Sequence, residues 1–386
     1  MYNILTLNKI AACGTDQLPA DKFHVASDIE SPDAILLRSA DMHSYNAPDS
    51  LLAVGRAGAG VNNIPVDKYA ERGIVVFNTP GANANAVKEL VIAALLMSSR
   101  KINEGINWVQ GLAGQTGVAK SVEAGKSQFV GPEISGKKLG VIGLGAVGVL
   151  VANACHSLGM DVYGYDPFVS VDSAWRLSRG VHKAAGIDII LAECDYITIH
   201  IPLNKETKAT FNTDTLSKVK KGVRILNFSR GDLVDNDAIK NALQNGSVSC
   251  YVTDFPNEEL LGVNGVIPIP HLGASTPESE DNCAVMAAEE INDYLLYGII
   301  RNSVNYPDCD APYTGRKRIC VHHKNIPNVV ARLTAEFANR GVNIDIMINR
   351  SKGVNAYTVM DIDDGALNGA EEKLRAVDGV IRVRVI

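Results

Sequence analysis

The stretch Leu139-Gly140-Val141-Ile142-Gly143-Leu144-Gly145-Ala146-Val147-Gly148 decides the fold class of this chain. Its apolar start predicts a buried strand, and its glycines open a predicted helix over residues 146–158. A glycine turn between a strand and a helix directs backbone N–H groups and the helix dipole at a bound phosphate. The GxGxxG spacing in this context predicts a dinucleotide-binding site; the alternative is a glycine turn with a capping Asp and no ligand.

Each glycine of this turn has its own expected role. Gly143 allows the tight turn, Gly145 lets the backbone approach a pyrophosphate, and Gly148 lets the helix pack on the strand. The next predicted strand, residues 161–165, is followed by Asp166, whose carboxylate is suited to accept hydrogen bonds from a ribose diol and to repel a 2′-phosphate. The sequence therefore predicts NAD rather than NADP as the cofactor. The expected cofactor contacts in this region are Gly143, Gly145, Ala146, Val147, Gly148 and Asp166.

Strands and helices alternate around this turn. Further strands are expected at residues 196–199, 224–227 and 249–253, with helices between them, and this succession predicts a doubly wound parallel sheet. Upstream, apolar residues at helical spacing predict one long helix from residue 86 to about residue 110. The Gly-, Ser- and Lys-rich stretch 116–136 is expected to be a loop or hinge.

The two ends of the chain have other patterns. Short apolar runs at 34–37, 52–55 and 75–78 predict strands of a second, smaller parallel sheet. A strong helix is expected over 278–297, and the Asn-, Asp- and Pro-rich stretch 301–315 is expected to be a linker. From residue 318 onward the order is strand, helix, strand, strand, helix, strand, which is typical of a ferredoxin-like unit.

Composition excludes several classes of protein. The hydrophobic content of 46% and charged content of 21% are those of a globular protein. A net charge of −6 argues against binding to nucleic acid or to an anionic membrane, and the sequence has neither a signal-peptide pattern nor a membrane-spanning run. Its seven cysteines are scattered singly, which favours a reducing cytoplasm and predicts no metal site.

Three later segments resemble the D-2-hydroxyacid dehydrogenase family: Asn227-Phe228-Ser229-Arg230-Gly231, Asp254-Phe255-Pro256-Asn257-Glu258 and Pro270-His271-Leu272-Gly273-Ala274-Ser275-Thr276. The resemblance covers essentially the whole chain. It implies that the catalytic residues are Arg230, Glu258 and His271. It also implies cofactor contacts from Ser229, Asp254, Gly273 and Ala274.

Chemistry supports the three catalytic roles independently. Hydride leaves a hydroxy acid as its hydroxyl proton departs, and the imidazole of His271 is the base that titrates nearest neutrality. A carboxylate that hydrogen-bonds to the ring stabilises the imidazolium, and Arg230 can pair with the substrate carboxylate. The family usually has one further residue after Asp254, so Glu258 or Glu259 could be the partner of His271; the ungapped match of residues 255–258 ranks Glu258 first.

His200 stands at a predicted strand end and receives a different interpretation from His271. We expect it to be structural or to contact the cofactor through its backbone.

These patterns together predict an α/β protein with three parts. A doubly wound, Rossmann-like cofactor domain is inserted in a smaller α/β substrate domain, and a ferredoxin-like domain follows. The expected division is substrate-binding 1–97 and 275–306, NAD-binding 98–274, linker 307–316 and regulatory 317–386.

Two N-terminal segments resemble those that contact substrate in the phosphoglycerate dehydrogenase branch of the family. They contain Arg38 and Ser39 in one, and Arg56 and Gly58 in the other. Two arginines after strands could clamp a phosphate, with Ser39 and the glycine amides completing the site. The alternative is a pair of solvated arginines beside a flexible turn.

The C-terminal part resembles an ACT domain, a regulatory module of amino-acid biosynthetic enzymes. In that resemblance, His323, Asn325 and Asn343 match the side chains that bind L-serine. Asn328 stands where the family usually has Gly; Asn tolerates a left-handed backbone, but its side chain could obstruct an effector. The alternative is a dimerisation domain without a ligand.

The function that follows from the resemblance is the NAD-dependent oxidation of 3-phospho-D-glycerate to 3-phosphohydroxypyruvate, the first step of L-serine biosynthesis. The alternatives are a dehydrogenase for another D-2-hydroxyacid, such as glycerate or lactate, and an NAD-sensing corepressor-like protein. We expect a cytoplasmic homodimer or homotetramer with L-serine as a candidate effector.

Overall fold

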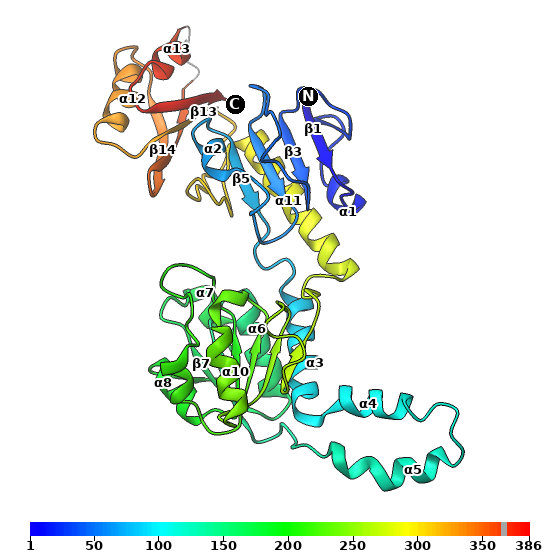
Figure 1. Ribbon diagram of the computed structural model, residues 1–386. Helices are drawn as coiled ribbons and strands as arrows, with labels where there is room; N and C mark the ends of the chain where they lie inside the picture. The colour runs from blue at the N-terminus through cyan, green and yellow to red at the C-terminus, as the bar shows by residue number, and fades with distance from the viewer. Residues whose placement is uncertain (364–368) are drawn as a thin grey trace. The chain divides into compact units, whose positions relative to one another are not determined.

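The computed structural model describes residues 1–363 and 369–386, which divide into two compact units (Figure 1). Unit 1 consists of Met1–Asn83 and Pro277–Ile386, and unit 2 is the intervening segment Ala84–Thr276. The predicted insertion of one α/β domain in another is therefore confirmed. The finer division of the chain into substrate, cofactor, linker and regulatory segments stays a prediction.

Unit 1 contains a parallel sheet of order β2-β1-β3-β4-β5. Helix α11 (Pro277–Tyr297) crosses one face of it (Figure 1). In β3, Ala34 and Leu36 pack toward α11, whereas Ile35 and Leu37 pack into the core on the other face, because successive side chains of a strand alternate. The remaining elements are β1 (Tyr2–Leu7), α1 (Ala12–Thr15), β2 (Phe23–Ala26), β3 (Ala34–Leu37), β4 (Ala53–Arg56), α2 (Val66–Ala70) and β5 (Val75–Asn78).

Unit 2 is a doubly wound domain. Its seven parallel strands run in the order β12-β11-β10-β9-β6-β7-β8, with α3 and α6 on one face and α8 and α10 on the other. Strands β6, β7 and β8 are added toward one side of the sheet, and β9 to β12 are added toward the other side, starting next to β6. The boundary between β6 and β9 is where such folds bind their ligands. The bounds are α3 (Ala84–Arg100), β6 (Lys138–Ile142), α6 (Ala146–Ser157), β7 (Asp161–Tyr165), α7 (Val171–Trp175), β8 (His182–Lys183), α8 (Ile187–Glu193), β9 (Tyr196–Ile199), α9 (Thr213–Ser217), β10 (Val223–Asn227), η2 (Gly231–Leu233), α10 (Asn236–Gln244), β11 (Val248–Thr253) and β12 (Val266–Pro268).

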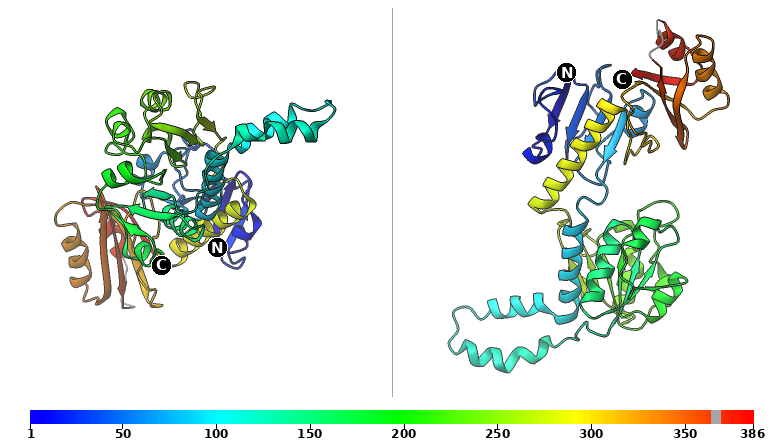
Figure 2. Two further views of the ribbon diagram at one scale, coloured as in Figure 1. Left: turned by 90° about the horizontal axis from the view of Figure 1, so that it is seen from below. Right: turned by 180° about the vertical axis from the view of Figure 1, so that it is seen from behind.

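Two predictions in unit 2 were wrong. The long helix expected over 86–110 is broken at Lys101, whose left-handed backbone (φ 46°, ψ 38°) separates α3 from α4 (Ile102–Gln110). The expected loop 116–136 contains α5 (Val118–Gly125) and the short helix η1 (Lys126–Phe129). The ring of Trp108 contacts that of Phe129 at 5.4 Å, so the segment folds back on α4. We call residues 102–129 the helical arm; Figure 2 shows it extending from the body of unit 2.

The C-terminal part of unit 1 has the predicted ferredoxin-like fold. Its antiparallel sheet has the order β14-β15-β13-β16. Ile319 and Val321 pack under α12 and α13, whereas Cys320 and Tyr357 belong to the core that contains α11. The bounds are β13 (Lys317–Lys324), α12 (Val329–Ala338), β14 (Ile344–Lys352), β15 (Asn355–Ile362), α13 (Ala370–Arg375) and β16 (Val380–Val385).

Arginines of the ferredoxin-like sheet hold the C-terminal end of α11. Arg384 donates to the carbonyls of Tyr294 and Leu295 at 3.1 and 3.0 Å, and Arg318 donates to that of Tyr297 at 2.8 Å. Helix C-termini leave carbonyls without intrahelical partners, and their dipole favours positive charge. Arg318 is fully buried and pairs with Asp361 at 2.6 and 2.8 Å.

Part of the stretch 301–315, which was expected to be a linker, is packed. Asn305 exchanges hydrogen bonds with the backbone of Ile74 and Val76, beside strand β5, and the buried hydroxyl of Tyr306 donates to the carbonyl of Ala70. Asn and Pro residues therefore occur here as specific polar contacts and turns, which composition alone does not distinguish from a flexible linker.

Candidate active site

The glycine turn of unit 2 has the geometry of a dinucleotide site. Gly143 has φ +93°, and a Cβ there would lie 2.4 Å from the carbonyl oxygen of His200. A Cβ on Gly148 would lie 1.9 Å from the carbonyl oxygen of Gly143. A Cβ on Gly145, by contrast, would meet nothing within 4 Å, so space remains beside it. The residue that precedes α6, Gly145, has no side chain to cap the helix, Ala146 in the first turn is exposed, and the N–H groups of that turn can bind an anion.

Asp166 lies beside this turn at the end of β7. Its Oδ2 accepts from the N–H of Leu144 at 2.9 Å, and its Oδ1 accepts from that of Phe168 at 2.8 Å. An ionised carboxylate has about four acceptor positions, so the two backbone bonds fix its orientation and leave positions for ribose hydroxyls. These residues fit a nicotinamide dinucleotide, which supports their predicted roles.

A buried amide shapes the loop that carries Arg230. The Asn227 side chain, at the end of β10, donates to the carbonyl of Arg230 at 2.9 Å and accepts from the N–H of Ser229 at 3.2 Å. The hydroxyl of Ser229 donates to the carbonyl of Ile199 in β9 at 2.7 Å, so the loop is tied to the strand that borders the switch point of the sheet. The Arg230 side chain itself is exposed. Sequence reasoning did not assign Asn227 a role, although it begins the first family-like segment.

His271 lies near Arg230, and its ring contacts an aromatic ring at a tilted angle. Its ring centroid is 4.8 Å from that of Phe255, with 55° between the planes. Burial lowers the pKa of His271, and the positive charge of Arg230 lowers it further. The imidazole is consequently in its neutral form near neutral pH, as a general base must be.

Neither Glu258 nor Glu259 is hydrogen-bonded to His271 within residues 1–363 and 369–386. Glu258 is exposed, and the carboxylate of Glu259 accepts from the amide of Asn236 at 2.8 Å. The ring that lies against His271 is that of Phe255. The pairing predicted for Glu258 therefore remains a prediction.

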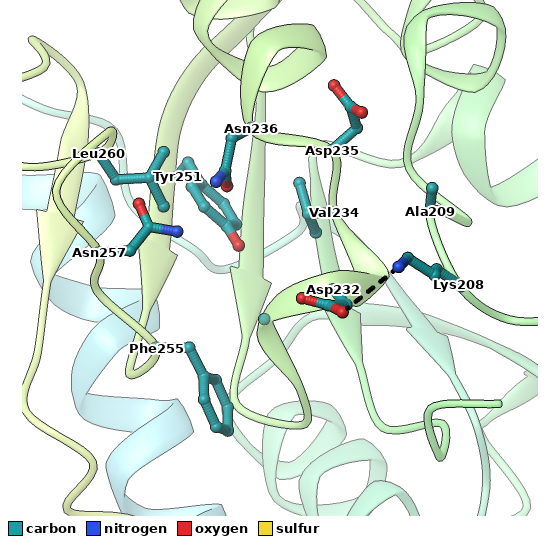
Figure 3. Close-up of a pocket in the computed structure, with 11 residues that line it drawn as sticks. Lys208, Ala209, Asp232, Val234, Asp235, Asn236, Tyr251, Phe255, Asn257 and Leu260 are labelled. Carbon is teal, nitrogen blue, oxygen red and sulfur yellow. Dashed lines mark ion pairs between the residues drawn. The ribbon is translucent and has the colours of Figure 1, made fainter.

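A cavity of about 220 Å³ lies behind this loop (Figure 3). Asp232 and Lys208, which both line it, form an ion pair at 3.8 Å, and neither Arg230 nor His271 is among the lining residues. Asn257 lines the cavity, and its Oδ1 is buried without a hydrogen-bond partner in the described part of the chain. Asn257 and Leu260, which stand on either side of Glu258 in the sequence, both line the cavity. The lining residues are Lys208, Ala209, Gly231, Asp232, Val234, Asp235, Asn236, Tyr251, Phe255, Asn257 and Leu260.

Asp254 and Gly273 come together beside the catalytic cluster. Burial raises the pKa of the Asp254 carboxyl to about 6, against the opposing charge of Arg230. The Oδ1 atom of Asp254 is buried with no partner among the described residues, and Oδ2 would lie 3.5 Å from a Cβ on Gly273. A carboxylate oxygen that lacks a partner is suited to bind an amide of the cofactor. The neighbouring Ala274 is half-buried.

His200 behaves as a structural residue. Its Nε2 is 2.9 Å from the hydroxyl of Thr198, its N–H donates to Ile142, and burial lowers its pKa to about 4. A ring that is neutral over the physiological range and already hydrogen-bonded agrees with the role expected from the sequence.

In unit 1, the two predicted substrate segments are neighbours. Leu37 and Arg56 are paired in strands β3 and β4, which places Arg38 and Arg56 at one edge of the sheet. Asn63 connects the loops: its Oδ1 accepts from Arg56 at 3.1 Å, and its amide donates to the carbonyl of Arg38 at 3.3 Å. Sequence reasoning missed Asn63, since nothing in its local pattern indicates this long-range contact.

The other two predicted substrate residues shape these loops through their backbone. The Ser39 N–H donates to Asn8 at 3.2 Å. Gly58 has φ +154°, a backbone conformation that L side chains rarely adopt, and a Cβ there would lie 2.4 Å from a guanidinium nitrogen of Arg56, which would have to move. The positive φ explains why a glycine stands two positions after Arg56.

The three predicted effector residues are not brought together. His323 is buried, and its ring nitrogens contact the carbonyl of Lys324 and the hydroxyl of Thr358, both at 2.9 Å. Asn325 and Asn343 are exposed in separate loops and bind Gly353 and Asp345 respectively. Asn328 has φ 68°, which confirms that asparagine maintains the left-handed turn before α12.

Comparison with known sequences identifies one protein family. Residues 92–273 match the family model "D-isomer specific 2-hydroxyacid dehydrogenase, NAD binding domain". The chain is 36% identical to D-3-phosphoglycerate dehydrogenase of Archaeoglobus fulgidus over 73% of its own length and 53% of that protein. It is 32% identical to D-3-phosphoglycerate dehydrogenase of Escherichia coli over 88% of its own length and 83% of that protein. The chain spans about half to three fifths of the length of the relatives in Archaeoglobus, Synechocystis and Bacillus.

Solved structures show the same fold. NAD⁺-bound 3-phosphoglycerate dehydrogenase of Entamoeba histolytica matches with a TM-score of 0.59 and 25% identity, over 78% of this chain and 98% of that one. D-mandelate dehydrogenase of Rhodotorula graminis matches with a TM-score of 0.67 and 21% identity, over 81% and 99% of the two chains. Of the residues that the structure describes, none belongs to a helix both long and apolar enough to span a bilayer.

Proposed function

The chain belongs to the D-isomer specific 2-hydroxyacid dehydrogenase family, and from that premise we propose that it oxidises 3-phospho-D-glycerate to 3-phosphohydroxypyruvate with NAD. This reaction is the first step of L-serine biosynthesis. The observation that carries the choice of substrate is the pair of arginines, Arg38 and Arg56, at the ends of adjacent strands. The names of the relatives point to the same substrate.

The proposed mechanism assigns one role to each residue of the cluster in unit 2. The glycine turn and Asp166 would hold NAD, which would supply the acceptor for the hydride of the substrate C2. His271 takes the hydroxyl proton on its neutral imidazole, and Arg230 binds the substrate carboxylate and polarises the developing carbonyl. Glu258 stabilises the imidazolium once its loop has moved toward the ring. Asp166, beside the glycine turn, selects NAD over NADP.

In unit 1, Arg38 and Arg56 bind the phosphate. A guanidinium binds phosphate through paired, charge-assisted hydrogen bonds, and Ser39 and the Gly58 loop add a hydroxyl and amides. A phosphate contact distinguishes 3-phosphoglycerate from glycerate or lactate, which are the substrates of the alternative function within the family.

We further propose that the protein is a homo-oligomer. The helical arm exposes Ile102, Ile106 and Val109 of α4, which are 42, 50 and 44% exposed. Apolar side chains along one helix that its own unit does not cover are suited to a second copy of the chain. Sedimentation of an Ile106→Glu variant should then show a smaller assembly than the unaltered protein. An unchanged mass would mean that the helical arm is not the interface between the copies.

The ferredoxin-like part is proposed to be an ACT-like regulatory domain with L-serine as its ligand, bound through His323, Asn325 and Asn343. Since these three residues do not meet within one chain, the site would be completed by a second copy. The protein is proposed to act in the cytoplasm, where its seven unpaired cysteines would stay reduced.

Steady-state assay with NAD and a panel of D-2-hydroxyacids tests the proposed activity. We expect 3-phosphoglycerate to have the highest kcat/KM, and His271→Ala to lose about 100-fold or more in turnover while it still binds NAD. Preference for glycerate or lactate would favour the alternative dehydrogenase. Tight NAD binding without turnover of any hydroxyacid would favour a corepressor-like protein.

A further inference from the structure

Arg38, one of the two arginines of the proposed phosphate clamp, already forms an ion pair with a carboxylate. Nη1 of Arg38 lies 2.6 Å from Oε1 of Glu280, which is in the first turn of α11. Both side chains are partly open to solvent, with exposed fractions of 40 and 47%. The pair lies entirely within unit 1.

Both arginines also act on the next turn of α11. Burial raises the pKa of the Cys283 thiol, and the positive charges of Arg38 and Arg56 oppose that rise. Cys283 follows Glu280 by one helical turn, so both guanidinium groups lie close to this part of the helix. The clamp thus holds two positive charges and one negative charge.

The N-terminus of α11 adds to the competition for Arg38. A helix N-terminus favours a negative group, and the first turn of α11 already carries Glu278 and Glu280. A phosphate that approaches Arg38 therefore meets a carboxylate that holds the same donor and is stabilised by the same dipole.

We propose that Glu280 is a specificity-determining residue of the clamp: its carboxylate competes with the substrate phosphate for Arg38 and weakens the binding of phosphorylated hydroxyacids. Glu280 thereby reduces the selectivity for 3-phosphoglycerate over a hydroxyacid with an uncharged tail. This inference rests on the proposed phosphate clamp. Exchange of the Glu280 carboxylate for the phosphate at Arg38 involves no covalent step.

The size of the effect follows from the exposure of the pair. An exposed ion pair contributes little, so removal of the competing charge should lower the KM for 3-phosphoglycerate by about three- to tenfold. The KM for D-glycerate, which has no phosphate, should change by less than about twofold. The ratio of the KM for 3-phosphoglycerate of the unaltered protein to that of the variant without the charge should decrease in 1 M salt, where the screening length is about 3 Å.

Glu280→Gln tests the inference, because glutamine retains the shape and removes the charge. Glu278→Gln is the matched control: it removes the same charge from the same helix turn, and Glu278 makes no ion pair with Arg38. We expect a lower KM for 3-phosphoglycerate in Glu280→Gln and none of this change in Glu278→Gln. A higher KM in Glu280→Gln would mean that Glu280 instead holds Arg38 in place for substrate, and an equal KM would remove Glu280 from the clamp.

The double variant Arg38→Ala/Glu280→Gln shows whether the effect passes through Arg38. In the Arg38→Ala background, Glu280→Gln should no longer change the KM for 3-phosphoglycerate. A persistent effect in that background would mean a general change of charge and would overturn the inference.

Titration with inorganic phosphate separates this inference from the proposed activity. If the unaltered protein does not oxidise 3-phosphoglycerate, the proposed function fails, but phosphate affinity still reports on the clamp. Phosphate should then bind more tightly to Glu280→Gln than to the unaltered protein or to Glu278→Gln. Equal affinity in all three proteins would overturn the role of Glu280 by itself.

Discussion

Two carboxylates compete for the role of partner to His271, and single substitutions separate them. Burial and Arg230 already lower the pKa of His271, and removal of a nearby negative charge lowers it further. Since oxidation needs the neutral imidazole, Glu258→Gln should shift the acidic limb of kcat/KM to lower pH and reduce the plateau by about tenfold or more. Glu259→Gln should remove only the bond to Asn236 and leave the pH profile in place. The reverse pattern would transfer the role to Glu259.

Asp166 carries the prediction on cofactor choice. Its carboxylate is oriented by the N–H groups of Leu144 and Phe168 beside the glycine turn, where a 2′-phosphate would meet a negative charge. We expect Asp166→Ala to lower the ratio of kcat/KM for NAD to that for NADP by about tenfold or more, the scale of one lost charge-assisted contact. Equal turnover of both cofactors by the unaltered protein would contradict the assignment.

Single residues were predictable where a local motif places them. The glycine turn, Asp166 and the loop of Arg230 follow from short segments whose spacing the backbone imposes. The contacts of Asn63 and the ring contact of Phe255 with His271 were not predictable, because no local sequence pattern indicates them. Glu280 was missed for the same reason: its partner Arg38 lies 242 positions earlier.

At the scale of secondary structure, buried strands were predicted well, and the short, less buried strands β8 and β12 were not. The runs 34–37 and 75–78 match β3 and β5, since fully buried parallel strands are continuous apolar runs. The short strands β8 and β12 lie at the sheet edges and have no such run. The break of the helix at Lys101 could not be predicted from the sequence. Lysine is common in helices, and no Gly or Pro stands at this position to indicate a helix end.

Helix α11 should depend on its arginine caps for stability. Arg384 is 7% exposed, donates to two carbonyls of α11 and lies 4.4 Å from the ring of Tyr294. Arg384→Met should reduce the free energy of unfolding of unit 1 by about 2–4 kcal/mol, because buried carbonyls lose charged donors. The control is Arg375→Met, which removes an exposed pair with Glu371 and should cost less than about 1 kcal/mol. Thermal unfolding of both variants measures the difference, and equal midpoints would show that the caps are dispensable.

For the whole molecule, the two-unit organisation was predictable and the fit of the C-terminal part was not. An inserted βα succession, flanked by strands and a long helix, identifies the insertion from sequence alone. The packing of residues 301–315 depends on bonds such as Asn305 to Ile74, and composition does not encode them. An effector at the ferredoxin-like part would therefore act on unit 1 as a packed body, not through a hinge at this stretch.

Titration calorimetry with L-serine tests the regulatory prediction. If serine binds, it should inhibit without competition with NAD, and Asn343→Ala should weaken that inhibition while turnover without serine stays the same. The left-handed turn at Asn328 is intact, so backbone geometry does not prevent binding. The absence of heat at millimolar serine on active, oligomeric protein would mean that this part serves assembly or another ligand.

The arginine-capped end of α11 limits how the C-terminal part of the chain could be exchanged for that of another protein. The ferredoxin-like sheet contributes Cys320, Tyr357 and Val359 to the same core as β3, β5 and α11, so the core is completed from both sides of the chain. A chain cut before residue 317 would expose the aromatic side of α11 to water and leave its last carbonyls without donors. The C-terminal part is consequently not an interchangeable cassette, and a graft between two members of the family would have to carry α11 along with it.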